Sequence, residues 1–553
     1  MAPDRPFTMQ VMQELFTNHE LLAREAARPR EPAGVVRRVG ILGGGTAGWM
    51  TALALRAQLP WLEVTLLEAP SIPIIGVGEA SVPSLVAFIH HYLKIPVLEF
   101  THAVKPTWKQ GIRFEWGLPE PYVFQAPFDW EVNGVGALGS IAETGDPNRF
   151  TLQSILMARD VTPVLRTDGR LQSFLPLFPF AYHLDNQRLV AFLKHTAIER
   201  GVRHGQCEIK DAPLRETLGP DGEPEIAHLT TTEGQKLEFD LYIDCSGFHS
   251  TLLGKKLGQP FTSYASSLFT DSALAFNAPH DGKLKPYTTA RTMPSGWCWN
   301  IPMVESDHLG YVHSSAHCSP DQALSEARAL WPNLTGERMV RFRSGRHERL
   351  WVGNVFAIGN SYAFVEPLES TGLLMITRAI TSLVRSFPIT EEKTTSTVKR
   401  FVNSTLGRDW DRLRWFLSAH YKFNRRLDTP FWTEVRETAD VSGIQPALDL
   451  FQASGPLSLL PRAVRASVLA DSEIFFYGLA GLDCILLGQQ VPFPKLAGDP
   501  SEVWRNRLQL AVEFSRRGVS QVEALKAVSE RPDWLEQLVN HPTSWVTKAV
   551  PYL

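Results

Sequence analysis

Three glycines at a fixed spacing are the residues whose arrangement most directly suggests a chemistry. Gly43, Gly45 and Gly48 have the G-x-G-x-x-G spacing and directly follow the apolar run 39–42, which we expect to form a buried parallel strand. The first glycine allows a tight turn, the second lets a pyrophosphate approach the backbone, and the third lets the next helix pack on the strand. The free amides at the start of that helix would face the phosphates.

An acidic residue at the end of a second apolar run completes this pattern. The run 64–67 predicts a second strand, and Glu68 follows it twenty positions after Gly48, where dinucleotide-binding units carry the acid that binds the ribose. Strand, glycines, helix, second strand and acid together favour a dinucleotide site over an ordinary strand-to-helix turn. We find one such fingerprint and no second one for a nicotinamide.

Several separate stretches, met in the same order, make the sequence resemble the tryptophan-halogenase branch of the flavin-dependent halogenases. The run from Trp297 to Pro302 (WCWNIP) matches the W-x-W-x-I-P signature of these enzymes. The other matching stretches are 43–48, 76–80, Trp108-Lys109, 366–372 (EPLESTG), His420-Tyr421 and 428–432. The similarity extends over about residues 36 to 440.

This resemblance implies a two-component enzyme of secondary metabolism, such as antibiotic biosynthesis. A separate flavin reductase would supply reduced FAD (FADH2), which reacts with O2 to give a flavin hydroperoxide. Chloride or bromide would attack the distal oxygen, and the hypohalous acid would cross a tunnel to an aromatic substrate. Two other functions stay open: a flavin monooxygenase that hydroxylates an aromatic, and a non-catalytic flavin-binding protein, against which Lys109 and Glu369 argue.

The resemblance also assigns roles to individual residues. Lys109 matches the family's catalytic lysine, which could hydrogen-bond to HOCl or, if desolvation lowers its pKa, become a chloramine. Glu369 matches the family's active-site glutamate, with Glu366 as the competing candidate. Thr371 and Gly372 begin a predicted helix, whose free amides suit a halide ion.

The remaining candidates line the cofactor or the path between cofactor and substrate. The predicted cofactor-binding residues are Gly43, Gly45, Thr46, Ala47, Gly48, Glu68, Gly78, Glu79, Ala80, Gly359 and Leu373. The predicted tunnel residues are Trp297, Trp299, Ile301, Pro302 and Ser370, although the two tryptophans could equally pack a core. We expect no metal site.

The substrate is predicted from what the sequence lacks. Relatives that act on free tryptophan carry an adjacent tyrosine pair and an acid near the end of their substrate helix, and the corresponding stretch here, 460–477, has no Tyr-Tyr. We therefore expect an indole, a phenol, or an aromatic residue within a larger peptide or carrier-bound molecule. The candidate ring-stacking walls, for which core packing is an equal alternative, are Phe124, Phe128, Phe476 and Tyr477.

The elements that must position these residues define an α/β fold. We expect an N-terminal extension (1–35) with a helix over 9–27, an FAD-binding glycine-fingerprint (Rossmann-like) module over 36–388, and a mainly helical substrate or lid region over 389–553. Within the module, a proline- and aromatic-rich substrate-loop excursion near 115–185 and a β-rich section interrupt the pattern. Strands are predicted over 227–232, 237–244, 268–276, 288–292 and 354–359, and helices over 84–93, 189–199 and 373–387.

Composition excludes several other classes. With 553 residues and 44% hydrophobic content the chain can bury a large core, and its net charge of −3 gives no reason to expect nucleic acid or an anionic membrane as a partner. The five cysteines are scattered without a C-x-x-C pair, which suits a reducing cytoplasm and argues against a disulfide framework or a zinc site. No apolar run is long enough for a membrane span. A homodimer is implied only by the resemblance.

Overall fold

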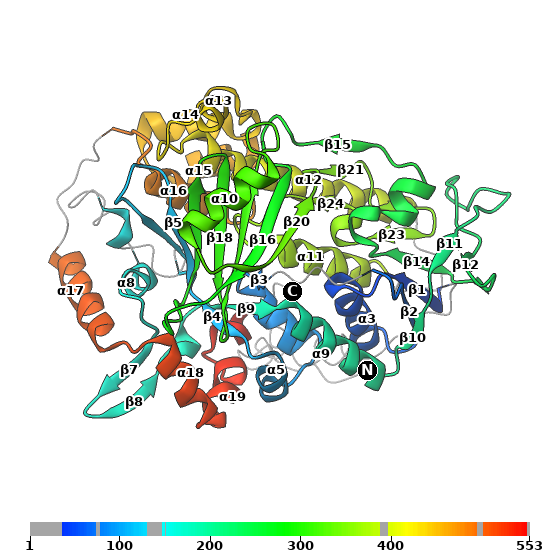
Figure 1. Ribbon diagram of the computed structural model, residues 1–553, viewed down its shortest axis with the longest axis horizontal. Coiled ribbons are helices and arrows are strands. Elements are labelled where there is room, and N and C mark those ends of the chain that lie inside the picture. Colours follow the sequence, from blue (N-terminus) through cyan, green and yellow to red (C-terminus); the bar gives the residue numbers. More distant parts are fainter. Residues whose placement is uncertain are drawn as a thin grey trace, which may run out of the picture.

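A computed structural model describes residues 36–72, 78–129, 146–149, 151–387, 396–494 and 502–549 (Figure 1). The helix predicted over 9–27 lies outside the described residues. The chain forms a nucleotide-binding sheet, a larger mixed sheet at the centre of the view, and a set of C-terminal helices. Within the described ranges, no helix is long and apolar enough to cross a membrane.

The first sheet is the glycine-fingerprint unit that the sequence predicts. Its strand order is β10 (Arg203–Gln206), β2 (Glu63–Glu68), β1 (Arg38–Leu42), β14 (Leu241–Asp244), β23 (Val355–Ala357) and β22 (Trp351–Val352). The first five strands run parallel and β22 is antiparallel to β23. Helix α3 (Thr46–Gln58) packs against α9 (Asn186–Glu199) and α11 (Gly372–Arg385). This arrangement confirms the predicted α/β class.

Two strands of this unit are shorter than predicted, for local reasons. In the predicted strand 237–244, the carboxylate of Asp240 accepts the backbone N–H groups of Arg37 and Arg38, so that regular pairing begins at Leu241. In the predicted strand 354–359, the chain turns at Gly359, whose φ is +71°. The Asp240 contact is tertiary and the turn at Gly359 is a matter of backbone conformation, so the apolar pattern predicts neither.

The second sheet has seven strands and is built by the β-rich section together with part of the predicted excursion. Its order is β20 (Thr335–Arg341), β16 (Ser272–Ala278), β19 (Asp307–His313), β18 (Gly296–Pro302), β17 (Thr288–Met293), β5 (Gly111–Glu115) and β6 (Phe124–Pro127). Only β17 and β5 pair in parallel. The stretch near 115–185 thus contains regular elements besides loops, including β6 and α8 (Leu152–Ala158).

A small three-stranded sheet joins the two large ones. Strands β3 (Gly78–Ala80) and β4 (Thr107–Lys109) both pair antiparallel with β9 (Ala181–Asp185). Lys109, the last residue of β4, lies opposite Ala181. The predicted helix 84–93 is present as α4 (Ser84–Ala87), continued by the single π-helical turn η1 (Phe88–Tyr92).

The C-terminal part of the chain is helical, as expected. Its helices are α12 (Ser396–Lys422), α13 (Pro430–Thr438), α14 (Gln445–Ser454), α15 (Arg462–Asp471), α16 (Gly478–Gly488), α17 (Glu502–Arg517), α18 (Gln521–Ser529), α19 (Pro532–Asn540) and α20 (Trp545–Ala549). The last helices return to the nucleotide-binding half of the chain: α18 contacts β4, and α19 packs on α5 (Val97–Val104).

Candidate active site

The glycine fingerprint forms a cradle that is closed on two sides and open on one. A Cβ at Gly43, whose φ is +123°, would lie 2.2 Å from the carbonyl oxygen of Cys245, and one at Gly48 would lie 2.0 Å from the carbonyl oxygen of Gly43. At Gly45 no atom lies within 4 Å of the same position. Gly45 is also the N-cap of α3 and has no side-chain cap, so the first amides of the helix remain available. An open backbone approach beside free amides fits a pyrophosphate.

Glu68 ends β2 beside this cradle. Its Oε1 contacts the ammonium of Lys194 and Nε2 of His204, the latter at 2.8 Å. Its Oε2 faces Gly44, where a Cβ would be only 1.9 Å away. Burial raises the pKa of Glu68, but the hydrogen bonds and charges of Lys194 and His204 outweigh it and hold the pKa below its usual value. The group is thus an ionised acceptor at the position expected for a ribose-binding acid.

The other predicted cofactor residues lie around the same edge. The backbone at Gly359 passes close to the methyl group of Ala47, where α3 and α11 meet. The hydroxyl of Thr46 donates to Oδ1 of Asn186 at 2.7 Å, and the side chain of Leu373 is buried in the core. Strand β3 contributes Gly78, Glu79 and Ala80, and burial raises the pKa of Glu79 to about 7.

Lys109 is fully buried and is held from two sides. Its ammonium donates to the carbonyl oxygen of Ser81 at 3.0 Å and to Oγ of Ser370 at 2.7 Å, and it lies 5.4 Å from the ring centroid of Phe128. Burial lowers the pKa of Lys109 to about 7, and the charge of Glu369 opposes part of that shift. An ammonium with two fixed acceptors keeps one N–H for a further acceptor.

A tight turn before α11 supplies the second half of the site. Ser370 has a left-handed backbone (φ +57°), and its N–H donates to the carbonyl oxygen of Pro367 at 2.9 Å. This turn aims the hydroxyl of Ser370 at Lys109 and buries Glu369 within reach of its charge. The carboxyl of Glu369 also contacts Nε2 of His420 at 2.7 Å.

Glu366, the competing glutamate, points into a different environment. It is completely buried and accepts a hydrogen bond from the hydroxyl of Thr270, near Tyr421 and Trp297. Burial raises the pKa of Glu366 to about 7. The structure therefore brings Glu369, and not Glu366, to Lys109.

The predicted halide residues form the start of α11. Thr371 is the N-cap and makes no side-chain cap, and its buried hydroxyl has no hydrogen-bond partner among the described residues. Gly372 is exposed, and no atom lies within 4 Å of where its Cβ would be. A helix of 14 residues thus begins without a side-chain cap next to the turn that carries Glu369, and its first amides have no partner within the helix.

Four of the five predicted tunnel residues occupy β18, and the fifth, Ser370, lies in the turn before α11. Trp297 and Trp299 lie on the same face, with ring centroids 6.1 Å apart, and both are buried together with Ile301 and Pro302. Trp299 packs flat over Gly310 of β19, where a Cβ would lie 2.0 Å from the ring. The carbonyl oxygen of Pro302 accepts a hydrogen bond from Thr107 at 2.7 Å, which ties the end of β18 to β4 two residues before Lys109.

The four predicted substrate-wall residues do not lie together. Phe128 is half-buried beside Lys109, and Tyr477 lies near Glu369 with its ring edge-on to Phe416. Phe124 is instead fully buried in β6 and stacked on Phe114 with centroids 4.9 Å apart, a core position. Phe476 is 39% exposed and covers the guanidinium of Arg378. The aromatic pattern could not separate these outcomes because core and wall positions use the same side chains.

Two contacts of the site were not predicted from the sequence. In the sequence, His420 belongs to one of the stretches that match the family. No local pattern indicates its contact with Glu369, which lies 51 residues away along the chain. Ser81 contributes through its carbonyl oxygen, so its residue type gave no signal.

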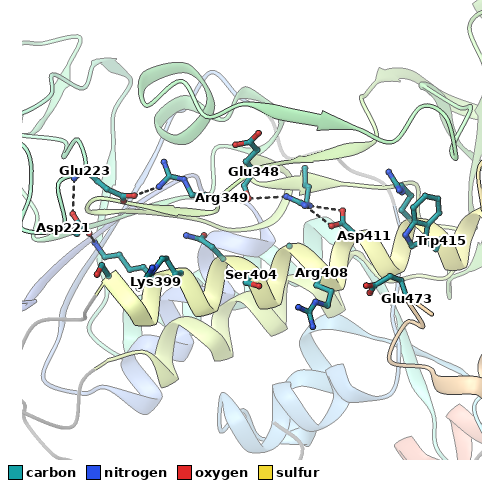
Figure 2. A pocket seen from close by; sticks show the side chains of 16 residues that line it. Asp221, Glu223, Glu348, Arg349, Lys399, Ser404, Arg408, Asp411, Trp415 and Glu473 are labelled. Atoms are coloured by element: carbon teal, nitrogen blue, oxygen red, sulfur yellow. Dashed lines mark hydrogen bonds and ion pairs between the residues drawn. The ribbon is translucent and has the colours of Figure 1, made fainter. Parts of the chain in front are cut away.

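An open cleft of about 940 Å³ along α12 contains none of these candidates (Figure 2). Ion pairs cross it, joining Arg346 to Asp411, Arg349 to Glu223 and Lys399 to Asp221. Because these charges are already paired, we interpret the cleft as a contact surface whose ion pairs hold α12 against the nucleotide-binding half of the molecule.

Comparison with known proteins agrees with the fold. The family model described as tryptophan halogenase matches residues 38–497. The chain is 33% identical to the tryptophan 6-halogenase ThaL of Streptomyces albogriseolus, over 91% of this chain and 98% of the relative, and 31% identical to the tryptophan 7-halogenase RebH of Lentzea aerocolonigenes, over 85% and 93%. The crystal structure of MibH, a lanthipeptide tryptophan 5-halogenase, superposes with a TM-score of 0.89 at 50% identity, covering 94% of this chain and 99% of that one.

The Rossmann-like cradle, the buried Lys109 and Glu369 in the turn before α11 are the arrangement that the resemblance to flavin-dependent halogenases predicts. The chain belongs to the tryptophan halogenase family. It is therefore an enzyme that halogenates aromatic rings and takes its reduced flavin from a separate reductase.

Proposed function

We propose that the enzyme uses FADH2, O2 and chloride or bromide to halogenate the indole ring of a tryptophan residue within a peptide. The observation that carries this proposal is the fully buried Lys109, held by Ser81 and Ser370 within reach of the charge of Glu369. A buried amine that is fixed but keeps one N–H is suited to hold a small oxidant against an aromatic ring.

The cofactor and halide would be held by groups that fit them. The open backbone at Gly45 and the start of α3 suit the pyrophosphate of FAD, and Glu68 suits its ribose. Reduced flavin with O2 supplies the oxidation of halide to hypohalous acid. The backbone amides at Thr371 and Gly372 would bind the halide, and the face of β18 with Trp297 and Trp299 would border the path to Lys109.

In the proposed reaction, ArH + HOX gives ArX + H2O. The ring carbon attacks the halogen, so that the C–X bond forms as the O–X bond breaks. Lys109 hydrogen-bonds the oxygen of HOX and protonates the departing hydroxide, which leaves as water. Glu369 accepts the proton lost from the same ring carbon. With a pKa of about 7, Lys109 is present as both ammonium and neutral amine at neutral pH. The neutral amine could form a chloramine, which is the alternative route for the same residue.

The substrate class rests on two observations. The stretch 460–477 lacks the tyrosine pair that would hold a free amino acid, and MibH, at 50% identity, acts on a lanthipeptide. Phe128 and Tyr477 are the aromatic residues that lie beside Lys109 and Glu369, and we propose that they stack on the indole. We propose no substrate contact for Phe124 or Phe476.

The remaining expectations stay predictions: a homodimer, a cytoplasmic location, a carrier-bound form of the substrate, and the division into regions 1–35, 36–388 and 389–553. None of them enters the proposed mechanism.

The test is halogenation by the purified enzyme with a flavin reductase, NADH and FAD. The probes are a short glycine-flanked tryptophan peptide and free tryptophan, each with chloride, bromide or neither. We expect a product with the halogen isotope pattern in the mass spectrum, mainly from the peptide and only with halide. Lys109→Met is expected to abolish this product while NADH is still consumed.

A hydroxylated product that forms without halide would overturn the proposal in favour of a monooxygenase. Equal or better turnover of free tryptophan would refute the peptide assignment but not the halogenation.

A further inference from the structure

His420 has two hydrogen-bonded ring nitrogens, and the partners constrain where its protons lie. Nδ1 is 3.0 Å from the carbonyl oxygen of Phe416, and Nε2 is 2.7 Å from Oε1 of Glu369. A carbonyl oxygen only accepts, so Nδ1 must carry a hydrogen. In a neutral imidazole Nε2 is then an acceptor, which requires a protonated Glu369; with an ionised Glu369, Nε2 must also carry a hydrogen. Either way, one proton is shared between Nε2 and Oε1.

The surroundings explain why the shared proton stays in the pair. His420 is 0% and Glu369 4% exposed, and the His420 ring is covered by Phe114 and Phe416. Both arrangements of the proton leave the pair with no net charge, whereas an ionised acid beside a neutral imidazole would bury an unpaired charge and leave two acceptors face to face. The titratable groups whose charges reach the pair are Lys109 on β4, Glu366 in the turn, Tyr477, and Cys484 on α16.

We propose that His420 is a positioning residue that fixes Glu369 by Oε1 and shares its proton, so that the pair, and not Glu369 alone, takes the proton released by the aromatic carbon. This inference rests on the proposed function. His420 binds Oε1 of Glu369, which leaves Oε2 as the oxygen that would meet the substrate.

The proton balance of the site follows from this arrangement. As the O–X bond breaks, Lys109 gives one proton to the departing hydroxide and becomes neutral. The ring carbon then loses its proton to Oε2 of Glu369. The proton shared between Oε1 and Nε2 moves onto Nε2, so that the pair becomes an imidazolium beside a neutral carboxylic acid. Lys109 loses one positive charge and the pair gains one, and the net charge of this buried site is unchanged.

The first test detects the shared proton without turnover. Solid-state ¹⁵N NMR of the full chain with ring-labelled histidine, compared with His420→Gln, isolates the signals of this residue among 16 histidines. We expect a protonated Nδ1 and an Nε2 shifted toward imidazolium in the wild type, and an unprotonated Nε2 in Glu369→Gln, whose amide can donate but carries no titratable proton. A neutral Nε2–H tautomer in the wild type, or no change in Glu369→Gln, would overturn the inference.

The second test is a kinetic isotope effect on the tryptophan peptide deuterated on its indole ring. In the wild type we expect no primary effect on product formation, because proton loss follows C–X bond formation and is fast. His420→Gln can donate to Glu369 but cannot store a proton, so kcat should fall about 10²-fold with KM nearly unchanged, and a primary isotope effect should appear. His183→Gln is the matched control.

His183 is also buried near Lys109, but its ring nitrogens meet the hydroxyls of Thr107 and Thr288 instead of an acid. Its replacement should reveal no isotope effect, whatever it does to the rate. A His420→Gln enzyme with wild-type kcat and no isotope effect would refute the relay. If the wild type makes no halogenated product at all, the proposed function fails, while the NMR result still decides whether the proton is shared.

Discussion

Ser370 shows how one strained residue serves the site. Its left-handed backbone (φ +57°) is costly for a residue with a Cβ, by roughly 1 kcal/mol, yet it places Oγ 2.7 Å from the ammonium of Lys109. A glycine would relieve the strain and lose the hydroxyl, whereas an alanine would lose the hydroxyl and keep the strain. The two replacements therefore separate the backbone effect from the hydrogen bond.

For Ser370→Gly and Ser370→Ala we expect the same loss of halogenation, about tenfold, because each leaves Lys109 with the carbonyl of Ser81 as its one remaining fixed acceptor. In thermal unfolding the glycine variant should be more stable than the alanine variant by about 1 kcal/mol. Measuring product formation and Tm for both variants checks the two parts. A glycine variant that halogenates at the wild-type rate would show that the hydroxyl does not hold Lys109.

At the scale of elements, the turn between β24 (Ala363–Phe364) and α11 directs two glutamates to opposite surroundings. Glu366 faces Thr270 in a dry environment, which raises the pKa of its carboxyl from 4.5 to about 7. The folded chain then binds this proton more tightly than the unfolded chain does. Stability from this group is fully present below pH 4.5 and is lost as pH rises toward 7.

Glu366→Gln should remove that pH dependence, because the amide keeps an acceptor for Thr270 and carries no charge. We expect the Tm of the variant to equal that of the wild type near pH 4 and to exceed it at pH 8. Paired thermal melts at the two pH values provide the measurement, with Glu369→Gln as a second variant from the same turn. A wild-type advantage at pH 8 would mean that Glu366 is ionised and paired in the folded enzyme.

The sequence predicted elements and motifs better than it predicted contacts. The fingerprint residues and the α11 start follow from local spacing, and Gly43 and Gly45 have the expected steric roles. The Glu369–His420 contact joins a turn to the last turn of α12, and Phe124 lies within β6 whereas Phe128 directly follows the end of that strand. Such pairings depend on how the two sheets meet, which no local pattern encodes.

At the scale of the whole molecule, the C-terminal helices lock the strand that carries Lys109. Gln521, the first residue of α18 and 0% exposed, accepts the backbone N–H of Trp108 at 2.7 Å and donates to the carbonyl oxygen of Lys285 at 2.9 Å. One side chain thus binds a buried backbone group on β4 and a partly buried one just before β17, more than 230 residues away along the chain. The position of Lys109 depends on this distant segment.

Gln521→Ala should therefore affect both stability and chemistry. The buried N–H of Trp108 would lose its partner, at a cost of about 1–3 kcal/mol, the partly buried carbonyl of Lys285 would lose its partner at a smaller cost, and β4 would be free to shift. Halogenation of the peptide should fall more than NADH-dependent flavin oxidation does, because the glycine cradle lies outside the three-stranded sheet. Gln445→Ala on α14 is the control, since that glutamine bonds only the exposed Asp449 and its loss should cost under about 0.5 kcal/mol. If both variants lose equal stability, or if Gln521→Ala leaves halogenation and flavin oxidation coupled as in the wild type, the C-terminal helices do not position the catalytic strand.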